Sequence, residues 1–286
     1  MFQQLISTLL LLLFCSALFT STPAVAGQGR ALKKYVRFQA GTTIAHGIVE
    51  GDRVRQIKGD LFGAYEATNT TYPLESLKLL APVKPTQVIA MAGNYRSHLA
   101  GEEISAKFKI PQAFFKSASC VIGTGENIVI PRDAEDVHFE GELVIVIGRE
   151  ARNVPEEQSL DYVFGVTCGN DVSERIWQKS DVQWWRAKGS DTFGPIGPVI
   201  VSGINYDDLQ LTLRANGEVK QQQRTSDLIH SVPATVSFIS RYVTLHQGDL
   251  IFTGTPGTTS AIKPGDTIEV EIEGVGTLTN GVVAEK

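Results

Sequence analysis

Residues 138–148 read HFEGELVIVIG, in which two acids are followed by an apolar run. Residues 143–147 end at Gly148 and have the length and β-branched content of a buried strand. Side chains two positions apart on a strand share a face, so Glu140 and Glu142 are expected side by side. Neighbouring carboxylates repel each other unless a proton or a cation lies between them. The stretch therefore predicts either a strand that begins at a cation site or a solvated strand end with paired acids.

The bulk composition indicates a globular chain with a sizeable core. Of the 286 residues, 42% are hydrophobic and 20% are charged. The net charge is -5 and no long basic run is present, which argues against nucleic acid as a partner. Beyond Cys15, the cysteines are Cys120 and Cys168. These two either form a disulfide or remain two buried free thiols.

Residues 1–26 have the pattern of a secretory signal peptide. An apolar stretch from about residue 5 to residue 19 precedes Ala24-Val25-Ala26, a small-x-small cleavage pattern. The stretch is shorter than the about 20 residues that a membrane-spanning helix needs. We therefore expect an exported protein, periplasmic or secreted, that is cleaved near Ala26 and keeps no stable membrane span. An uncleaved membrane anchor is the alternative.

Two folded regions are expected after the signal peptide. Residues 27–82 alternate apolar and polar side chains around Gly-Thr-Thr and Glu-Gly-Asp turns, which predicts a small β-rich subdomain with a short helix at residues 74–80. The proline-punctuated residues 81–85, APVKP, mark a boundary, and residues 83–286 form the larger domain.

The larger domain is predicted to be mainly β, in an α+β arrangement with short helices. Strands are expected at residues 87–91, 113–115, 127–130, 143–147, 163–166, 198–201, 209–215, 249–253 and 267–272. Helices are expected at residues 173–179, with Ser173 as N-cap, and at residues 231–243.

A third acid extends the acidic pair. Asp171 follows the predicted strand at residues 163–166 and precedes the predicted helix at residue 173. An Asp at such a junction is often only a helix cap. Together with Glu140 and Glu142, however, it makes an all-oxygen site, which suits Mg²⁺, Mn²⁺ or Ca²⁺ better than Zn²⁺.

Histidine and threonine lie where two other predicted strands end. His98 can serve as a general base near neutral pH, with Glu102 four residues later as its partner if the segment is helical. The alternative is a histidine in a surface loop. In FTGTPGTTS (252–260), Thr255 lies in a loop whose backbone amides can hold an oxyanion, unless the loop is a plain tight turn.

Four further side chains are candidates for the substrate side of the site. Lys116 and Lys188 can hold an anionic substrate, although most lysines face solvent. Arg175 and Gln178 lie on the predicted helix after Asp171 and are candidates for substrate binding.

Several stretches together resemble the fumarylacetoacetate hydrolase family. They are AGNYRSH (92–98), HFEGELVIVIG (138–148), GNDVSERIWQ (169–178), FTGTP (252–256) and KPGDTIEVEIEGVGTLTN (263–280). They occur in the family's order and at similar intervals, from about residue 86 to residue 283. The resemblance implies a mixed β-roll of the fumarylacetoacetase C-terminal type. It also implies a divalent metal, usually Mg²⁺ or Mn²⁺, and a homodimer.

The resemblance also implies roles for individual residues. The metal-binding carboxylates match Glu140, Glu142 and Asp171. The groups on the substrate side match Lys116, Gln178, Lys188 and Thr255. His98 matches the histidine that activates water, and Glu269 aligns with a glutamate that partners this histidine in some members. Short members place a glutamate three residues after the histidine, where this chain has Gly101 followed by Glu102 and Glu103.

We therefore predict a metal-dependent hydrolase that cleaves a C–C bond in a small diketo acid of the acylpyruvate or fumarylacetoacetate type. The reaction would use a metal-bound enolate and a water activated by His98, while Lys116 and Lys188 hold negative charge. The same site would also suit an oxo-acid decarboxylase, a hydratase or an isomerase. The non-enzymatic alternative is an exported binding protein that keeps the metal but lacks turnover.

Overall fold

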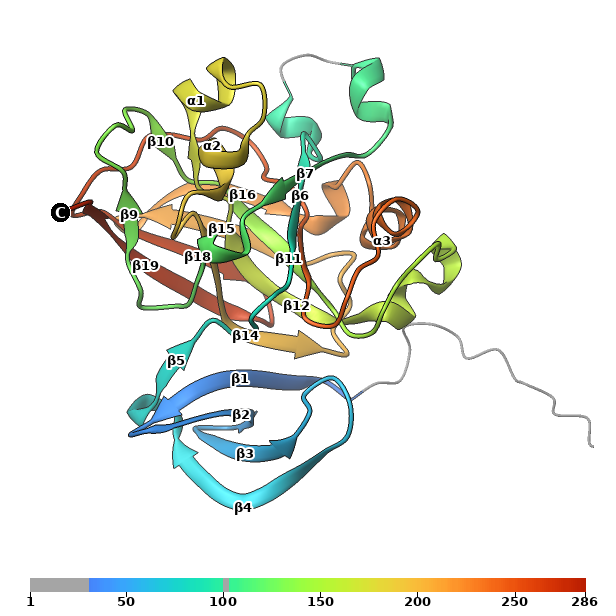
Figure 1. Cartoon of the computed structure of the whole chain (residues 1–286), viewed down its shortest axis with the longest axis vertical. Coiled ribbons are helices and arrows are strands. Elements are labelled where there is room, and N and C mark those ends of the chain that lie inside the picture. Colours follow the sequence, from blue (N-terminus) through green and yellow to red (C-terminus); the bar gives the residue numbers. More distant parts are fainter. Residues whose placement is uncertain (1–30, 100–102) are drawn as a thin grey trace, which may run out of the picture.

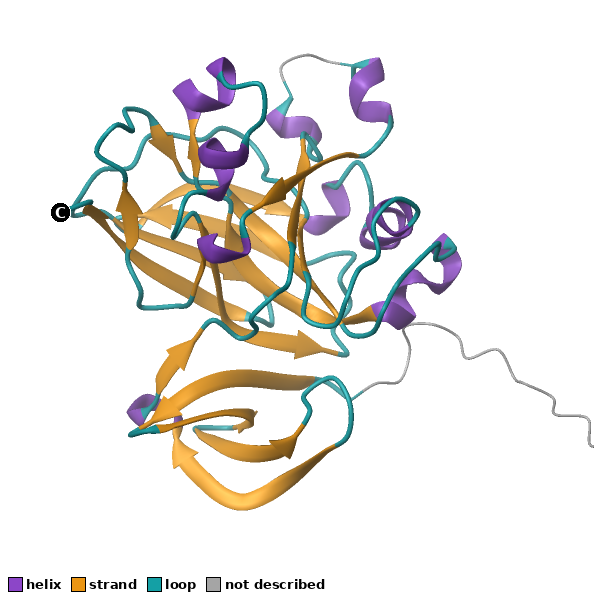
Figure 2. Ribbon diagram, in the orientation of Figure 1, coloured by secondary structure: helices purple, strands orange, loops and turns teal. Residues whose placement is uncertain are grey.

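A computed structural model of the chain describes residues 31–99 and 103–286 (Figure 1). Strands dominate the fold and the helices are short (Figure 2), which confirms the predicted mainly β class. The predicted signal peptide at residues 1–26, the anchor alternative and Glu102 lie outside the described residues. Within the described ranges, no helix is long and apolar enough to cross a membrane.

Most strands belong to one twelve-stranded mixed sheet. Its path runs through β4 (Tyr65–Pro73), β3 (Arg53–Gly59), β2 (Thr43–Glu50), β1 (Lys33–Ala40), β14 (Gly194–Ser202), β12 (Val163–Asn170), β11 (Gly141–Ile147), β17 (Leu250–Phe252), β6 (Val88–Ala92) and β7 (Gln112–Lys116). Two short strands join it at the side, β5 (Lys78–Leu80) on β1 and β8 (Val121–Ile122) on β14. Most pairings are antiparallel, whereas β17 pairs with β6, and β14 with β8, in parallel.

A second sheet has five strands, in the order β16 (Glu218–Arg224), β15 (Gln210–Ala215), β18 (Thr267–Ile272), β19 (Gly276–Ala284) and β9 (Ile128–Ile130). A two-stranded ribbon pairs β10 (Val137–His138) with β13 (Ser173–Glu174). The α-helices are α1 (Arg175–Ser180), α2 (Trp185–Gly189) and α3 (Val232–Ser240). The 3-10 helices cover Leu74–Ser76, Arg96–His98, Ala106–Lys109, Ala118–Cys120, Glu156–Tyr162 and Thr225–Asp227.

Strand β11 is buried on both faces, which explains the uninterrupted apolar run after Glu142. Leu143, Ile145 and Ile147 point into a core cluster that includes apolar side chains of the five-stranded sheet. Val144 and Val146 belong to a second cluster, on the other face, with side chains of the N-terminal strands. A strand covered on both sides is expected to be apolar at successive positions. Residues 143–147 therefore lie between the two core clusters.

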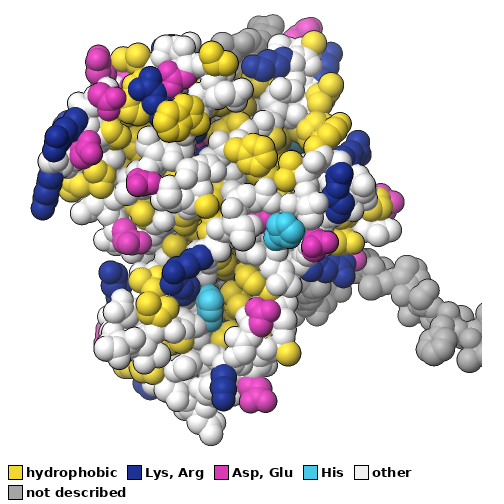
Figure 3. All heavy atoms as spheres, in the orientation of Figure 1, with side chains coloured by type: hydrophobic (Ala, Val, Ile, Leu, Met, Phe, Trp, Pro, Cys, Tyr) yellow, Lys and Arg dark blue, Asp and Glu magenta, His cyan; other side chains and the backbone are white. Residues whose placement is uncertain are grey.

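The N-terminal strands extend the main sheet. Strands β1 to β4 form the blue-to-cyan lobe below the rest of the chain in Figure 1. The first residues of β1 pair with β14, and residues 37–39 pair with β5. Charged side chains of both signs are scattered over the face of the molecule shown in Figure 3.

Two local predictions are wrong. The helix expected at residues 74–80 is only the 3-10 helix Leu74–Ser76, followed by β5, because β5 pairs with backbone groups of β1 that β14 leaves open. Ser173 is not the N-cap of the following helix. It lies in β13 and donates to the backbone oxygen of Asp171, while the side chain of Glu174 caps α1.

Two further predictions are settled by the described residues. The helix expected at residues 231–243 is α3, and Ser231 caps its N-terminus by accepting from the backbone N–H of Ala234. Cys120 and Cys168 are buried and unpaired, so the disulfide alternative is wrong.

Candidate metal centre and cavity

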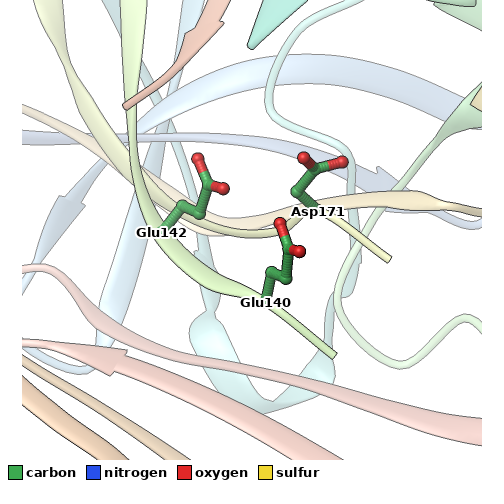
Figure 4. Close-up of side chains that lie close together, drawn as sticks. All are labelled: Glu140, Glu142 and Asp171. Carbon is green, nitrogen blue, oxygen red and sulfur yellow. The ribbon is translucent and has the colours of Figure 1, made fainter. Parts of the chain in front are cut away.

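The pairing of β11 with β12 brings three carboxylates together. Glu140 directly precedes β11, Glu142 is the second residue of β11, and Asp171 directly follows β12. The register places Gly141 opposite Asn170, and the backbone N–H of Asp171 donates to the Glu140 oxygen at 2.8 Å. One oxygen from each carboxylate lies within 4.8 Å of the others, and the three groups turn toward one space (Figure 4). All three side chains are buried.

Three cationic side chains contact this carboxylate triad. Lys188 Nζ lies 2.7 Å from Glu140 Oε2 and 2.8 Å from Asp171 Oδ2. Arg175 contacts Glu140 Oε1 at 2.6 Å, and Lys116 contacts Asp171 Oδ1 at 2.5 Å. Burial by itself raises the pKa of Glu140, but Lys188 and Arg175 more than offset this and hold the pKa at about 2. Glu140 is therefore ionised over the physiological range.

Glu142 is the acid of the triad that forms no ion pair with the described residues. Its Oε2 accepts from the backbone N–H of Gly254 at 2.6 Å, and its Oε1 is buried without a partner among the described residues. Burial, and then the charges of Asp171 and Glu140, raise the pKa of Glu142 well above its usual range. An unpaired buried carboxylate oxygen is unfavourable. A divalent cation between the three carboxylates would satisfy it, so the donor set fits Mg²⁺, Mn²⁺ or Ca²⁺.

Lys116 lies behind the triad and does not reach the substrate side. Its side chain is fully buried, and Nζ donates to Asp171 Oδ1, to the Phe193 oxygen at 3.1 Å and to the backbone oxygen of Lys188. An ammonium group has three N–H donors, and these contacts use all of them. Lys116 is therefore placed to neutralise and orient Asp171.

A cavity of about 240 Å³ opens beside Glu140. Its polar lining consists of His98, Glu140, Arg175, Gln178, Lys188 and Thr255. Its larger apolar lining side chains are Met91, Leu99, Phe108, Phe114 and Trp184. Pockets for drug-sized ligands usually measure about 300–1,000 Å³. The structure thus brings most of the predicted site residues around one space that suits a small molecule.

His98 is held by a backbone carbonyl. It ends the 3-10 helix Arg96–His98, and its Nδ1 lies 2.6 Å from the Gly257 oxygen. A carbonyl oxygen only accepts, so Nδ1 carries the proton and Nε2 is left as an acceptor. The structure does not bring Glu269 to His98, since Glu269 lies on β18 and does not line the cavity.

The remaining predicted residues contact each other or the backbone near the triad. Arg175 donates to Gln178 Oε1 at 2.8 Å, which orients the amide of Gln178. The hydroxyl of Thr255 donates to the Gly141 oxygen at 3.0 Å. Thr255 therefore ties the loop after β17 to the start of β11, where the acids lie.

Gln221 is a residue of the site that the sequence did not reveal. Its Oε1 accepts from the Gly141 N–H at 2.9 Å, and its Nε2 donates to Thr255 Oγ1 at 2.8 Å and to the Pro256 oxygen at 2.6 Å. This buried amide thus holds the acidic strand against the threonine loop. Gln221 is one of three consecutive glutamines, and nothing in that run distinguishes it from its neighbours.

The comparisons with known proteins agree with this arrangement. The family model described as Fumarylacetoacetate (FAA) hydrolase C-terminal matches residues 87–283, and one described as Rv2993c-like, N-terminal, matches residues 33–82. Protein Rv2993c of Mycobacterium tuberculosis is 46% identical over 233 residues, which cover 80% of this chain and 87% of that protein.

Two further relatives carry names that specify a reaction. The crystal structure of 2-hydroxyhepta-2,4-diene-1,7-dioate isomerase from Mycobacterium marinum is 42% identical, with a TM-score of 0.82 over 88% of this chain and 99% of that one. Oxaloacetate tautomerase fahd2, mitochondrial, of Xenopus laevis is 35% identical over 221 residues, or 73% of this chain and 69% of that protein. The chain therefore belongs to the fumarylacetoacetate hydrolase family, whose members are enzymes.

Proposed function

We propose that this protein is a divalent-metal-dependent enzyme that interconverts the keto and enol forms of a small dianionic 2-oxo acid. The observation that carries the proposal is that His98 lines one small cavity together with Glu140, the member of the carboxylate triad that reaches it. The names of the isomerase and tautomerase relatives support proton transfer as the reaction type.

Glu140, Glu142 and Asp171 would hold Mg²⁺ or Mn²⁺. When bound, the ion would supply Lewis acidity that polarises a ketone oxygen and stabilises negative charge on it. His98 would move the proton. Its Nε2 takes a proton from the carbon beside the ketone and delivers it to the ketone oxygen, which gives the enol, and the reverse transfers regenerate the ketone. The Nδ1–H bond to Gly257 keeps the ring in place.

The charge of the site supports a dianionic substrate. The three triad carboxylates are matched by three cations, Lys116, Arg175 and Lys188. A divalent ion therefore leaves the centre with an excess of two positive charges. An acid with two carboxylates restores neutrality in a buried site, where unbalanced charge is costly.

Hydrolysis of a C–C bond in an acylpyruvate or fumarylacetoacetate-like acid is the second candidate. It is favoured by the family to which the chain belongs, and His98 Nε2 could accept a proton from water in the same position. Tautomerisation is preferred because two relatives carry the names of an isomerase and a tautomerase. It also requires no second reactant beside the acid in a cavity of about 240 Å³.

The test is to assay enol–keto conversion of oxaloacetate and pyruvate release from acylpyruvates, each with Mg²⁺ and with Mn²⁺. We expect conversion of oxaloacetate that falls by about 10²–10⁴-fold in His98→Ala, the usual contribution of a general base. His246→Gln, at an exposed histidine outside the cavity, is the control. Pyruvate release that depends on His98, without tautomerisation, would favour hydrolysis. Activity unchanged in His98→Ala would refute both candidates.

A further inference from the structure

A chain of polar contacts leads from the cavity to the ribbon formed by β10 and β13. Thr259 Oγ1 lies 2.8 Å from the terminal nitrogen Nη2 of Arg175 and 2.9 Å from Nδ1 of His138. His138 Nε2 in turn lies 2.8 Å from Asp136 Oδ1. An isolated bridge between His138 and Ala261 brings the loop that carries Thr259 to this ribbon.

The donors and acceptors of this chain can be assigned. A guanidinium group only donates, so Thr259 Oγ1 accepts from Arg175. The single proton of the hydroxyl is then available for Nδ1 of a neutral His138, whose Nε2–H donates to Asp136. Thr259 is therefore the junction between an arginine of the cavity and a histidine outside it.

These contacts fix Arg175 at three points. Nη2 uses its two hydrogens on Glu140 Oε1 at 2.6 Å and on Thr259, and Nη1 donates to Gln178 at 2.8 Å. A guanidinium carries five N–H groups, so two remain for a ligand after these contacts with described residues. Because Arg175 lines the cavity, they can bind a carboxylate there.

We propose that Thr259 is a positioning residue that sets the recognition of the second carboxylate of the substrate through Arg175. The inference rests on the proposed function. Without the hydroxyl, the guanidinium keeps its contacts with Glu140 and Gln178 but loses one of the three contacts that fix its orientation. The donors left for the ligand then lose their preferred direction, while the carboxylate triad is untouched. Binding of the acid's second carboxylate weakens, and binding of its metal-chelating end does not.

The test compares two 2-hydroxy acids that share the same chelating end. L-malate has a second carboxylate and L-lactate does not. Their dissociation constants are measured by calorimetry on the Mg²⁺-loaded full chain. In Thr259→Val, which keeps the shape of the side chain, we expect malate to bind about tenfold more weakly, the scale of one hydrogen bond to a charged group. Lactate binding stays within about twofold, and Thr259→Ser restores malate binding.

A double-mutant cycle tests whether His138 acts through Thr259. His138→Phe removes the acceptor of the Thr259 proton, so its effect on malate is expected to be smaller than that of Thr259→Val and to disappear in the double variant. Two independent, additive losses would contradict the chain of contacts. A loss of thermal stability common to malate-bound and free protein would indicate a merely structural role.

Failure of this inference can be told apart from failure of the proposed function. Equal losses for malate and lactate in Thr259→Val, no loss for either, or wild-type protein that does not prefer malate would overturn the role of Thr259. In that case oxo-acid turnover by the wild type would still support the proposed function. Absence of turnover, with a malate preference that depends on Thr259, would overturn the proposed function alone.

Discussion

The substitution Glu142→Gln is predicted to stabilise the metal-free protein and to abolish most of its response to metal. In the described residues, Glu142 Oε1 is buried and unpaired, a condition that costs about 1–3 kcal/mol. A glutamine amide keeps the size of the side chain and can donate to the carboxylates of Asp171 or Glu140. The expected gain of about 1–3 kcal/mol corresponds to a rise in Tm of roughly 2–12 °C.

The raised pKa of Glu142 determines how the stability difference between the variant and wild type changes with pH. Because this pKa is higher in the folded than in the unfolded chain, the folded state binds the proton more tightly. Glu142 therefore contributes stability below its unfolded pKa of about 4.3, and this contribution is lost as the pH rises through the folded pKa. Glutamine does not titrate, so the advantage of the variant grows with pH over that interval.

Bound metal is expected to stabilise the wild type more than the variant. A ligand at about 100 times its Kd stabilises a folded protein by about 2.7 kcal/mol. Wild type should gain this amount with Mg²⁺ or Mn²⁺, whereas Glu142→Gln has lost a charged ligand and should gain much less.

The assay is urea unfolding at about pH 5 and about pH 8, with chelator and with saturating metal. Glu66→Gln, at an exposed acid of β4, changes the net charge equally and serves as control. The reasoning is refuted if the variant is less stable than wild type in chelator, or if metal stabilises both proteins equally.

Three further outcomes are expected. Lys116→Met removes the buried ammonium beside Asp171 and should cost about 3–5 kcal/mol in urea unfolding; a loss below about 1 kcal/mol would show that this buried pair contributes little. Tyr95→Phe should leave the unfolding free energy within about 1 kcal/mol of wild type or raise it, because the buried hydroxyl has no partner among the described residues; a larger loss would contradict this. Burial raises the pKa of Cys120 to about 11 and that of Cys168 to about 12. A thiol reagent at about pH 8 should therefore label neither thiol in the folded protein and both after unfolding without reductant; labelling of the native protein would be the contrary result.

The carboxylate triad was predictable because its geometry follows from local rules. Alternation along β11 gives Glu140 and Glu142 one face, and the position of Asp171 directly after a neighbouring strand supplies the third oxygen ligand. The periodicity of a strand can be read from the sequence, whereas the pairing of β11 with β12 is seen only in the structure. The mainly β fold was predictable for the same reason, since most apolar runs in the larger domain became strands.

The contacts of Lys116 and Gln221 could not be predicted from the sequence. Lys116 ends β7, and its acceptors come from Asp171 and from the backbone of residues 188 and 193, so its role depends on how three distant segments pack. Gln221 joins Gly141 to the threonine loop across two sheets. In each case the side chain's type permits many partners, and the tertiary structure selects among them.

The arrangement of Lys116 explains how a buried acidic triad can fold before any ion is present. Three carboxylates brought to within 4.8 Å of one another would repel strongly in a buried site. Lys116 and Lys188 cancel charge on Asp171, and Arg175 and Lys188 cancel charge on Glu140. Glu142 Oε1, in contrast, has no partner among the residues that the structure describes. A site neutralised at every acid would have little affinity for a cation, and a site neutralised at none would be unstable. A Glu142 that forms no ion pair within residues 31–99 and 103–286 satisfies both requirements. Its free carboxylate oxygen favours metal binding and, for the same reason, lowers the stability of the metal-free protein.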